Sequence, residues 1–308
     1  MSVTTITQRR DKMRSSEFSR LHPFTLFMFF AILAGAGAFV IQPVFIALSL
    51  CGAACFALRL CGRAVLKKAP LLLIPLFLAG GINVLFNHRG VTVLAKLPSG
   101  NAVTLEALIY GLLAGCMLCG AMIWFYCFGK LFTSDRLMCL TGRFFPALTV
   151  IISMTVRFIP LFVRRFREIS EAHSQLGFGY REGSIPKRLR NLARIFSILI
   201  SRSLEDSITA ADSMRSRGYG LSGRSSFNMF RYSLRDAVLT VIISVLGGYV
   251  IFCEIKGVNS FTCYPRITFA QTDLMSVIQF SAFGLLCFLP VIFELTEDHK
   301  WRSQLSEI

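Results

Sequence analysis

The 308-residue chain has few charged residues. Aspartate, glutamate, lysine and arginine together make up 16% of it, against about 25% in a typical soluble domain. Hydrophobic residues make up 54%, and they occur in blocks about as long as a bilayer is thick. The shortage of charge therefore excludes an ordinary soluble domain and indicates an integral membrane protein.

The chain also lacks the sequence motifs of a nucleotide-binding or metal-binding protein. It contains no G-x-x-x-x-G-K-[ST] sequence and therefore no P-loop. Most of its 10 cysteines lie inside apolar blocks and its 4 histidines are scattered, so we expect no metal site and no directly bound cofactor. If the chain acts in an ATP-driven process, a partner must use the ATP.

Acidic residues are scarce relative to basic ones. The 33 lysines and arginines against 17 aspartates and glutamates give a formal net charge of +16. In a soluble protein this charge would suggest nucleic acid. Here the basic residues concentrate in particular loops, and the positive-inside rule explains that distribution more simply. We expect contact with membrane lipid and no binding of nucleic acid.

Six apolar blocks predict membrane spans. The second is short enough to be tilted or partly interfacial, and a retained first span is favoured over a cleaved signal peptide. The blocks cover Phe24–Ile41, Val44–Leu58, Pro70–Phe86, Leu105–Phe128, Asp236–Phe252 and Leu274–Phe293. The basic loops then place both termini in the cytoplasm. The predicted fold is all-α: a multi-pass cell-membrane protein with about six transmembrane helices.

This reading divides the chain into five segments. They are an N-terminal cytoplasmic tail (1–23), spans one to four (24–128), a basic cytoplasmic module (129–235), spans five and six (236–293) and a C-terminal cytoplasmic tail (294–308).

The basic module contains two long amphipathic helix patterns. The first places Phe158, Phe162, Phe166, Ile169, Ala172 and Leu176 on one face. The second has a stripe made of Leu189, Leu192, Phe196, Leu199, Ile200, Leu204 and Ile208. A continuous helix from 187 to 217 would be about 45 Å long. It is too charged to span a bilayer and too apolar on one face to stand alone in water, so we expect it at the membrane face, against the first helix and the spans.

The two helix patterns end in a similar way. Gln175-Leu176-Gly177 is followed by an aromatic residue, and so is Ser216-Arg217-Gly218. Two similar ends suggest two similar docking sites. The alternative is a pair of ordinary helix C-caps with basic residues that offset the helix dipole. The pattern alone leaves both interpretations open.

Several stretches resemble the transmembrane T component of energy-coupling-factor (ECF) transporters, the EcfT/CbiQ family. Residues 213–220 are similar to the family's A-M-E-A-R-G-Y-G helix end. The other similar stretches are Leu21-His22-Pro23-Phe24-Thr25, residues 86–90, residues 104–111 and Arg157-Phe158-Ile159-Pro160. The likeness covers roughly residues 20–255, and the ordered set is more specific than any one motif.

The resemblance implies a non-catalytic subunit of a prokaryotic importer. In that family the T component joins two cytoplasmic ABC ATPases, which use the ATP, to a membrane S component that captures a vitamin or a metal ion. Two coupling helices each end in a tip that docks on one ATPase. Arg217 would be the docking arginine, flanked by Ser216 and Gly218, with Arg215 as a supporting basic residue.

The first tip departs from the family's pattern. In Gln175-Leu176-Gly177, Leu176 stands where the family has arginine. Three alternatives remain open: this tip docks through apolar packing, Arg181 replaces the missing arginine, or the two ATPases are not identical.

Two other classes of function compete with this interpretation. A conventional ABC permease or channel would favour polar residues along several spans, and these spans are nearly bare of charge. A membrane-embedded enzyme would need clustered polar groups, whereas Glu106, Asp236, Glu254 and Asp273 lie singly at predicted span ends. Co-purification of two ATPase subunits separates a T component from both classes.

Overall fold

The computed structural model describes residues 17–62, 65, 69–87, 90–96, 102–180, 183–219, 221, 230, 232–259, 261–263, 268 and 273–306. The chain divides into two compact units. The apolar unit comprises Met1–Thr133 and Phe230–Ile308, and the amphipathic unit comprises Ser134–Met229. Each unit is described by itself.

The apolar unit contains an apolar helix at each of the six predicted positions. They are α2 (Pro23–Phe39), α3 (Pro43–Cys61), α4 (Ala69–Phe86), α5 (Leu105–Leu131), α9 (Leu234–Ile255) and α10 (Leu274–Ser306). Within the described residues, α3, α5, α9 and the Leu274–Thr296 part of α10 are long and apolar enough to cross a membrane, whereas α2 and α4 contain shorter apolar stretches. The structure supports an all-α, polytopic membrane fold with four such helices.

Aromatic side chains form much of the core of the apolar unit. Phe18, in the short turn η1 (Glu17–Arg20), is fully buried and meets the rings of Phe29 and Phe56 edge-on, at centroid distances of 5.5 and 5.8 Å. Phe56 in turn stacks on Trp124 of α5. The interlocked rings join α2, α3 and α5 through dispersion contacts and burial from solvent.

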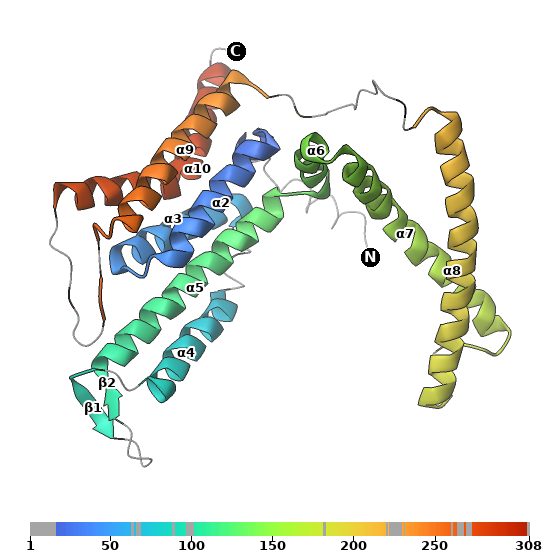
Figure 1. The fold of residues 1–308 in the computed structure, drawn as a ribbon, viewed down its shortest axis with the longest axis horizontal. Helices are drawn as coiled ribbons and strands as arrows, with labels where there is room; N and C mark the ends of the chain where they lie inside the picture. Colours follow the sequence, from blue (N-terminus) through green and yellow to red (C-terminus); the bar gives the residue numbers. More distant parts are fainter. Residues whose placement is uncertain are drawn as a thin grey trace. The chain divides into compact units, whose positions relative to one another are not determined.

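Glycines allow α4 and α5 to pack with their backbones close together (Figure 1). A Cβ atom at Gly111 would lie 3.0 Å from the Cα atom of Gly80, and one at Gly115 would lie 2.9 Å from the Cα atom of Leu76. Side chains at these two positions would push the helices apart, so the small residues permit the close packing. A Cβ atom at a third glycine of α5, Gly120, would instead lie 3.7 Å from the hydroxyl oxygen of Ser49 in α3.

A two-stranded antiparallel sheet connects α4 to α5, an element that the all-helical prediction did not include. Its strands are β1 (Val93–Lys96) and β2 (Ala102–Thr104). The Thr92 hydroxyl donates a 2.6 Å hydrogen bond to the buried carboxylate of Glu106, and Thr104 caps α5 by accepting from the amide of Ala107. These bonds fix the sheet to the start of α5.

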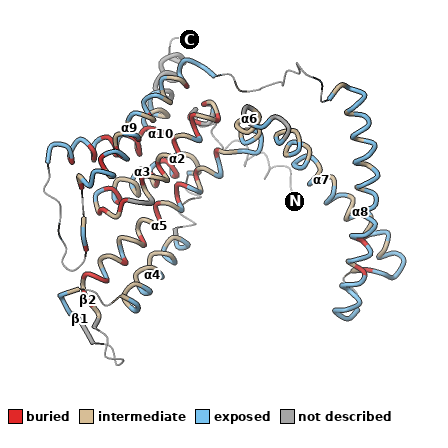
Figure 2. Tube along the Cα trace, viewed as in Figure 1, coloured by how far each residue is buried: buried red, intermediate tan, exposed pale blue. Residues whose placement is uncertain are grey.

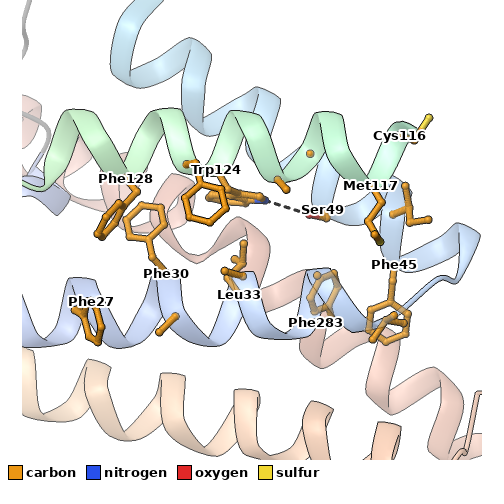
Figure 3. Close-up of a pocket in the computed structure, with 18 residues that line it drawn as sticks. Phe27, Phe30, Leu33, Phe45, Ser49, Cys116, Met117, Trp124, Phe128 and Phe283 are labelled. Carbon is orange, nitrogen blue, oxygen red and sulfur yellow. Dashed lines mark hydrogen bonds between the residues drawn. The ribbon is translucent and has the colours of Figure 1, made fainter. Parts of the chain in front are cut away.

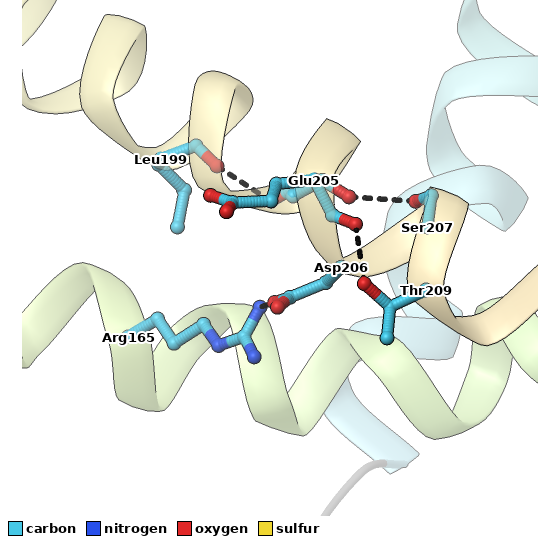
Figure 4. A network of polar contacts seen from close by, with 7 residues as sticks. Arg165, Leu199, Glu205, Asp206, Ser207 and Thr209 are labelled. Atoms are coloured by element: carbon cyan, nitrogen blue, oxygen red, sulfur yellow. Dashed lines mark hydrogen bonds and ion pairs between the residues drawn. The ribbon is translucent and has the colours of Figure 1, made fainter.

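The amphipathic unit contains α6 (Ser134–Phe144), α7 (Pro146–Gln175) and α8 (Ile185–Ser216). The two long helices lie at the predicted positions and pack against each other. Arg165 of α7 forms an ion pair with Asp206 of α8, which ties the pair together along its length (Figure 4).

The apolar stripe predicted for α8 is mostly not its buried face. Within this unit the buried residues of α8 are Asn191, Ile195 and Leu199. Of the predicted stripe only Leu199 is buried, while Leu189, Phe196, Ile200, Leu204 and Ile208 are exposed (Figure 2). The reason is geometric: α7 is a single neighbour and covers only a narrow strip of α8, so most of a broad apolar face stays uncovered.

Candidate functional site

Helix α8 ends in a Schellman motif, a backbone turn that satisfies the last carbonyls of a helix. The amide of Tyr219 donates to the carbonyl of Met214 at 3.1 Å, and the amide of Gly218 donates to that of Arg215 at 3.1 Å. Gly218 has φ 76°, a conformation that favours glycine. The chain turns away at this glycine and leaves the Arg217 side chain exposed at the helix end.

Helix α7 ends in the same motif. The amide of Phe178 donates to His173 at 2.9 Å, the amide of Gly177 donates to Ser174 at 3.0 Å, and Gly177 has φ 79°. Leu176 has φ −85° and ψ 4°, against −83° and 5° for Arg217. The two residues therefore occupy equivalent backbone positions, and the predicted similarity of the two ends extends to their geometry.

The backbone motif by itself does not mark a docking site. Helix α9 also ends this way, because Gly257 (φ 67°) donates to Glu254 at 2.9 Å and Val258 donates to Cys253 at 3.2 Å. The side chain that the motif presents is more informative. Leu176 is 71% exposed, so the first tip presents a bare apolar group where the second presents a cation.

The first tip is braced against α8. The Asn191 amide, 2% exposed, donates a 3.2 Å hydrogen bond to the carbonyl of Gly179, and the Arg194 guanidinium lies 5.6 Å from the centre of the Phe178 ring. Cation–π contacts of this kind stabilise exposed sites by about 0.5–1 kcal/mol. No sequence pattern indicates Asn191, because a single asparagine in a basic helix has no periodic neighbours of its kind.

The remaining predicted tip residues lie at the same two ends. Gln175 and Arg215 are exposed, in the last turns of α7 and α8. The Ser216 hydroxyl donates to the carbonyl of Ser213 at 2.8 Å, so its polar group is satisfied within the helix end. Arg181 lies outside the described residues.

The structure keeps the two tips apart. The first tip contacts α8 at Asn191, and Arg217 lies in the second tip. At 1.5 Å per residue these positions are about 40 Å apart along α8. The unit therefore presents two separate candidate sites, one near each end of the same long helix.

Hydroxyl groups beside the uncovered apolar stripe of α8 are satisfied within the helix. Ser203, Ser207 and Thr209 donate to carbonyls four residues earlier in the helix, at 2.5, 2.6 and 3.0 Å (Figure 4). Two of them, Ser203 and Ser207, line a shallow groove between α7 and α8 with Phe162, Phe196, Leu199, Ile200 and Leu204. Hydroxyls satisfied in this way cost little when an apolar partner covers them.

Three of the four acidic residues at predicted span ends have structural partners. Glu106 accepts from Thr92, Asp236 accepts from two backbone amides, and Glu254 accepts from Gln279 at 3.5 Å. Within the part of the chain that the structure describes, no group of three or more His, Cys, Asp or Glu residues could hold a metal ion. The three carboxylates therefore connect neighbouring segments of the apolar unit.

Comparison with known proteins points to the same family as the sequence resemblance. The CbiQ family, described as cobalt transport protein, matches residues 15–228. The energy-coupling factor transporter transmembrane protein EcfT of Bacillus selenitireducens is 31% identical over 104 residues, which are 33% of this chain and 39% of that protein. EcfT of Lactobacillus helveticus is 31% identical over 107 residues, 34% and 39% of the two chains.

A third relative, EcfT 1 of Listeria monocytogenes, is 29% identical over 106 residues, 34% of this chain and 40% of its own length. The chain thus spans about two fifths of the length of the curated relatives it matches. The family match is broader, because residues 15–228 are more than half of the 308. The chain therefore belongs to the CbiQ family of cobalt transport proteins, as its resemblance to the EcfT/CbiQ family indicated.

Proposed function

We propose that the chain is the transmembrane coupling subunit of an ECF-type importer for a vitamin or a metal ion. In this role it hydrolyses no ATP itself. It transmits the ATP-driven motion of two cytoplasmic ATPases to a membrane S component that binds the substrate. Both termini and the amphipathic unit are then cytoplasmic, in agreement with the concentration of basic residues there.

One observation carries the proposal. The same helix-ending geometry occurs at Leu176 and at Arg217, and it presents an exposed side chain at two sites about 40 Å apart. Two equivalent, well-separated ends suit two partner subunits of one kind. In this proposal Arg217 docks through a charge-assisted contact and Leu176 through apolar packing.

The helix pair is suited to the transmission of rigid-body motion. The Arg165–Asp206 ion pair joins α7 to α8, and the Asn191–Gly179 hydrogen bond joins the turn that follows α7 to α8. A displacement of either tip therefore moves both helices together. The uncovered apolar face of α8, with Ile200 and Leu204 near its middle, is the surface we assign to the S component.

Purification of the complex tests this function. The full chain, carrying an affinity tag, is extracted from its own membranes in mild detergent, and the co-purifying proteins are identified and quantified by mass spectrometry. We expect two ATPase subunits and one small membrane protein for each copy of the chain.

The other classes of protein predict different results. A conventional permease or channel, reconstituted alone in vesicles, would conduct its substrate unaided. A membrane-embedded enzyme would purify without ATPases and would turn over a lipid or a peptide. Either result would contradict the coupling function.

A further inference from the structure

A groove of about 370 Å³ lies between α2 and α5 in the apolar unit (Figure 3). Small residues on the two facing helices leave this space, among them Ala34 and Gly37 on α2 and Gly120 and Ala121 on α5. Its volume falls within the range of about 300–1,000 Å³ that is typical of small-molecule pockets. The helix ends discussed above take no part in it.

The side chains that line the groove are almost all apolar. Among the described residues that line it, Ser49 has the one side-chain oxygen, and that oxygen accepts a 3.1 Å hydrogen bond from the indole nitrogen of Trp124. An apolar cavity with so few polar partners stays free of water. The occupant must therefore be apolar.

The shape of the groove selects a thin occupant. Its lining extends along α2 from Phe27 to Val40, which is about 20 Å at 1.5 Å per residue. All of the empty space in the groove, open parts included, amounts to about 1140 Å³. A helix about 10 Å across and as long as this lining would fill roughly 1,500 Å³. A transmembrane helix of a partner cannot enter this space, whereas a single extended hydrocarbon chain can.

The rim of the groove is continuous with the lipid-facing surface. Phe27 is 40% exposed and Phe125 is 63% exposed, while Trp124 at the floor is 4% exposed. Helix α5 is long and apolar enough to cross a membrane, and α2 has a shorter apolar stretch. In the bilayer, the medium beside the exposed phenylalanines is lipid hydrocarbon.

From these observations we propose that the groove binds one acyl chain of a membrane phospholipid, which lies between α2 and α5 with its tail against Trp124. The acyl chain fills the space that the small residues leave beside the Phe30–Trp124 and Phe30–Phe128 ring contacts, which join the two helices directly. The proposal depends on the membrane location of the chain and not on its coupling function.

Trp124 reports directly on the occupant. The chain has 2 tryptophans, so replacing the other one (Trp301→Phe) leaves Trp124 as the single emitter. The full chain is reconstituted in vesicles of phosphatidylcholine with either ordinary or brominated acyl chains, and bromine quenches indole fluorescence at contact. We expect strong quenching by brominated chains, although Trp124 is buried from the bulk lipid.

Two glycines of α2 provide a matched pair of variants. Gly37 lines the groove and Gly35 does not, and a Cβ atom at either would meet nothing within 4 Å. Gly37→Phe should fill the groove and remove most of the quenching, whereas Gly35→Phe should leave it unchanged. Gly120→Leu fills the groove from the α5 side and serves if Gly37→Phe fails to fold.

Three results would overturn the proposal. They are an absence of quenching in the unfilled protein, equal quenching in the Gly35 and Gly37 variants, and quenching that survives both filling substitutions. The first would mean that the groove is closed or covered by protein. The other two would mean that Trp124 meets only bulk lipid.

Discussion

The backbone amide of His22 donates a 2.9 Å hydrogen bond to Oδ1 of Asp236, across 214 residues of sequence. The second oxygen of the same carboxylate accepts from the amide of Ser233 at 3.0 Å, and Asp236 is 5% exposed. One buried side chain thus joins the start of α2 to the start of α9. Because α9 is the first helix after the amphipathic unit, this carboxylate fixes the point at which the chain re-enters the apolar unit.

Replacement of Asp236 tests the importance of this link. Asp236→Ala leaves two part-buried amides without an acceptor, and a hydrogen bond to a charged group contributes about 1.5–3 kcal/mol. We expect a lower temperature of unfolding in detergent, measured by scanning fluorimetry. Asp236→Asn keeps one acceptor oxygen and should lose less. Equal stability of the alanine variant and the unaltered chain would show that the link is dispensable.

Charge reversal at Arg217 tests the second tip. A charge-assisted contact contributes about 1.5–3 kcal/mol, so its loss should weaken ATPase binding by about 10- to 150-fold. We expect Arg217→Glu to abolish uptake and ATPase co-purification while the chain still inserts in the membrane. Arg202→Glu, an exposed charge reversal elsewhere on α8, is the control. Normal uptake by the Arg217 variant would refute the docking role.

The first tip has its own test. Burial of a leucine side chain contributes about 1.5–3 kcal/mol, so Leu176→Ser should weaken ATPase binding if this tip docks by apolar packing. The matched control is Ile151→Ser in α7, since Ile151 is 64% exposed and Leu176 is 71% exposed. Both variants are compared by quantitative co-purification. An identical effect of the two substitutions would argue against a specific role for Leu176.

The glycine at the first tip permits a test of backbone conformation alone. Gly177 has φ 79°, and a Cβ atom there would meet nothing within 4 Å. Gly177→Ala should therefore destabilise the helix end by about 1–2 kcal/mol through backbone strain. Gly129→Ala, in α5 with equally open surroundings, should be neutral or slightly stabilising. Thermal unfolding and hydrogen exchange at residues 173–178 measure the difference.

The sequence by itself determined where the apolar helices of the fold lie. The bilayer requires long apolar helices, so the blocks that begin near Phe24, Pro70 and Leu274 could be found from composition alone. The ends of the two amphipathic helices could also be found from a few neighbouring residues. A glycine at the end of an amphipathic helix pattern predicts a C-cap, because left-handed φ favours glycine.

The tertiary structure alone decided which faces of these helices are covered. The apolar stripe predicted for α8 exists, but α7 is too narrow to bury most of it. Asn191 is buried only because the chain after Gly177 folds back on it. The partners of Asp236 and Trp124 come from distant segments. A helix pattern repeats over a few residues, whereas burial depends on neighbours hundreds of residues away, and no local pattern specifies them.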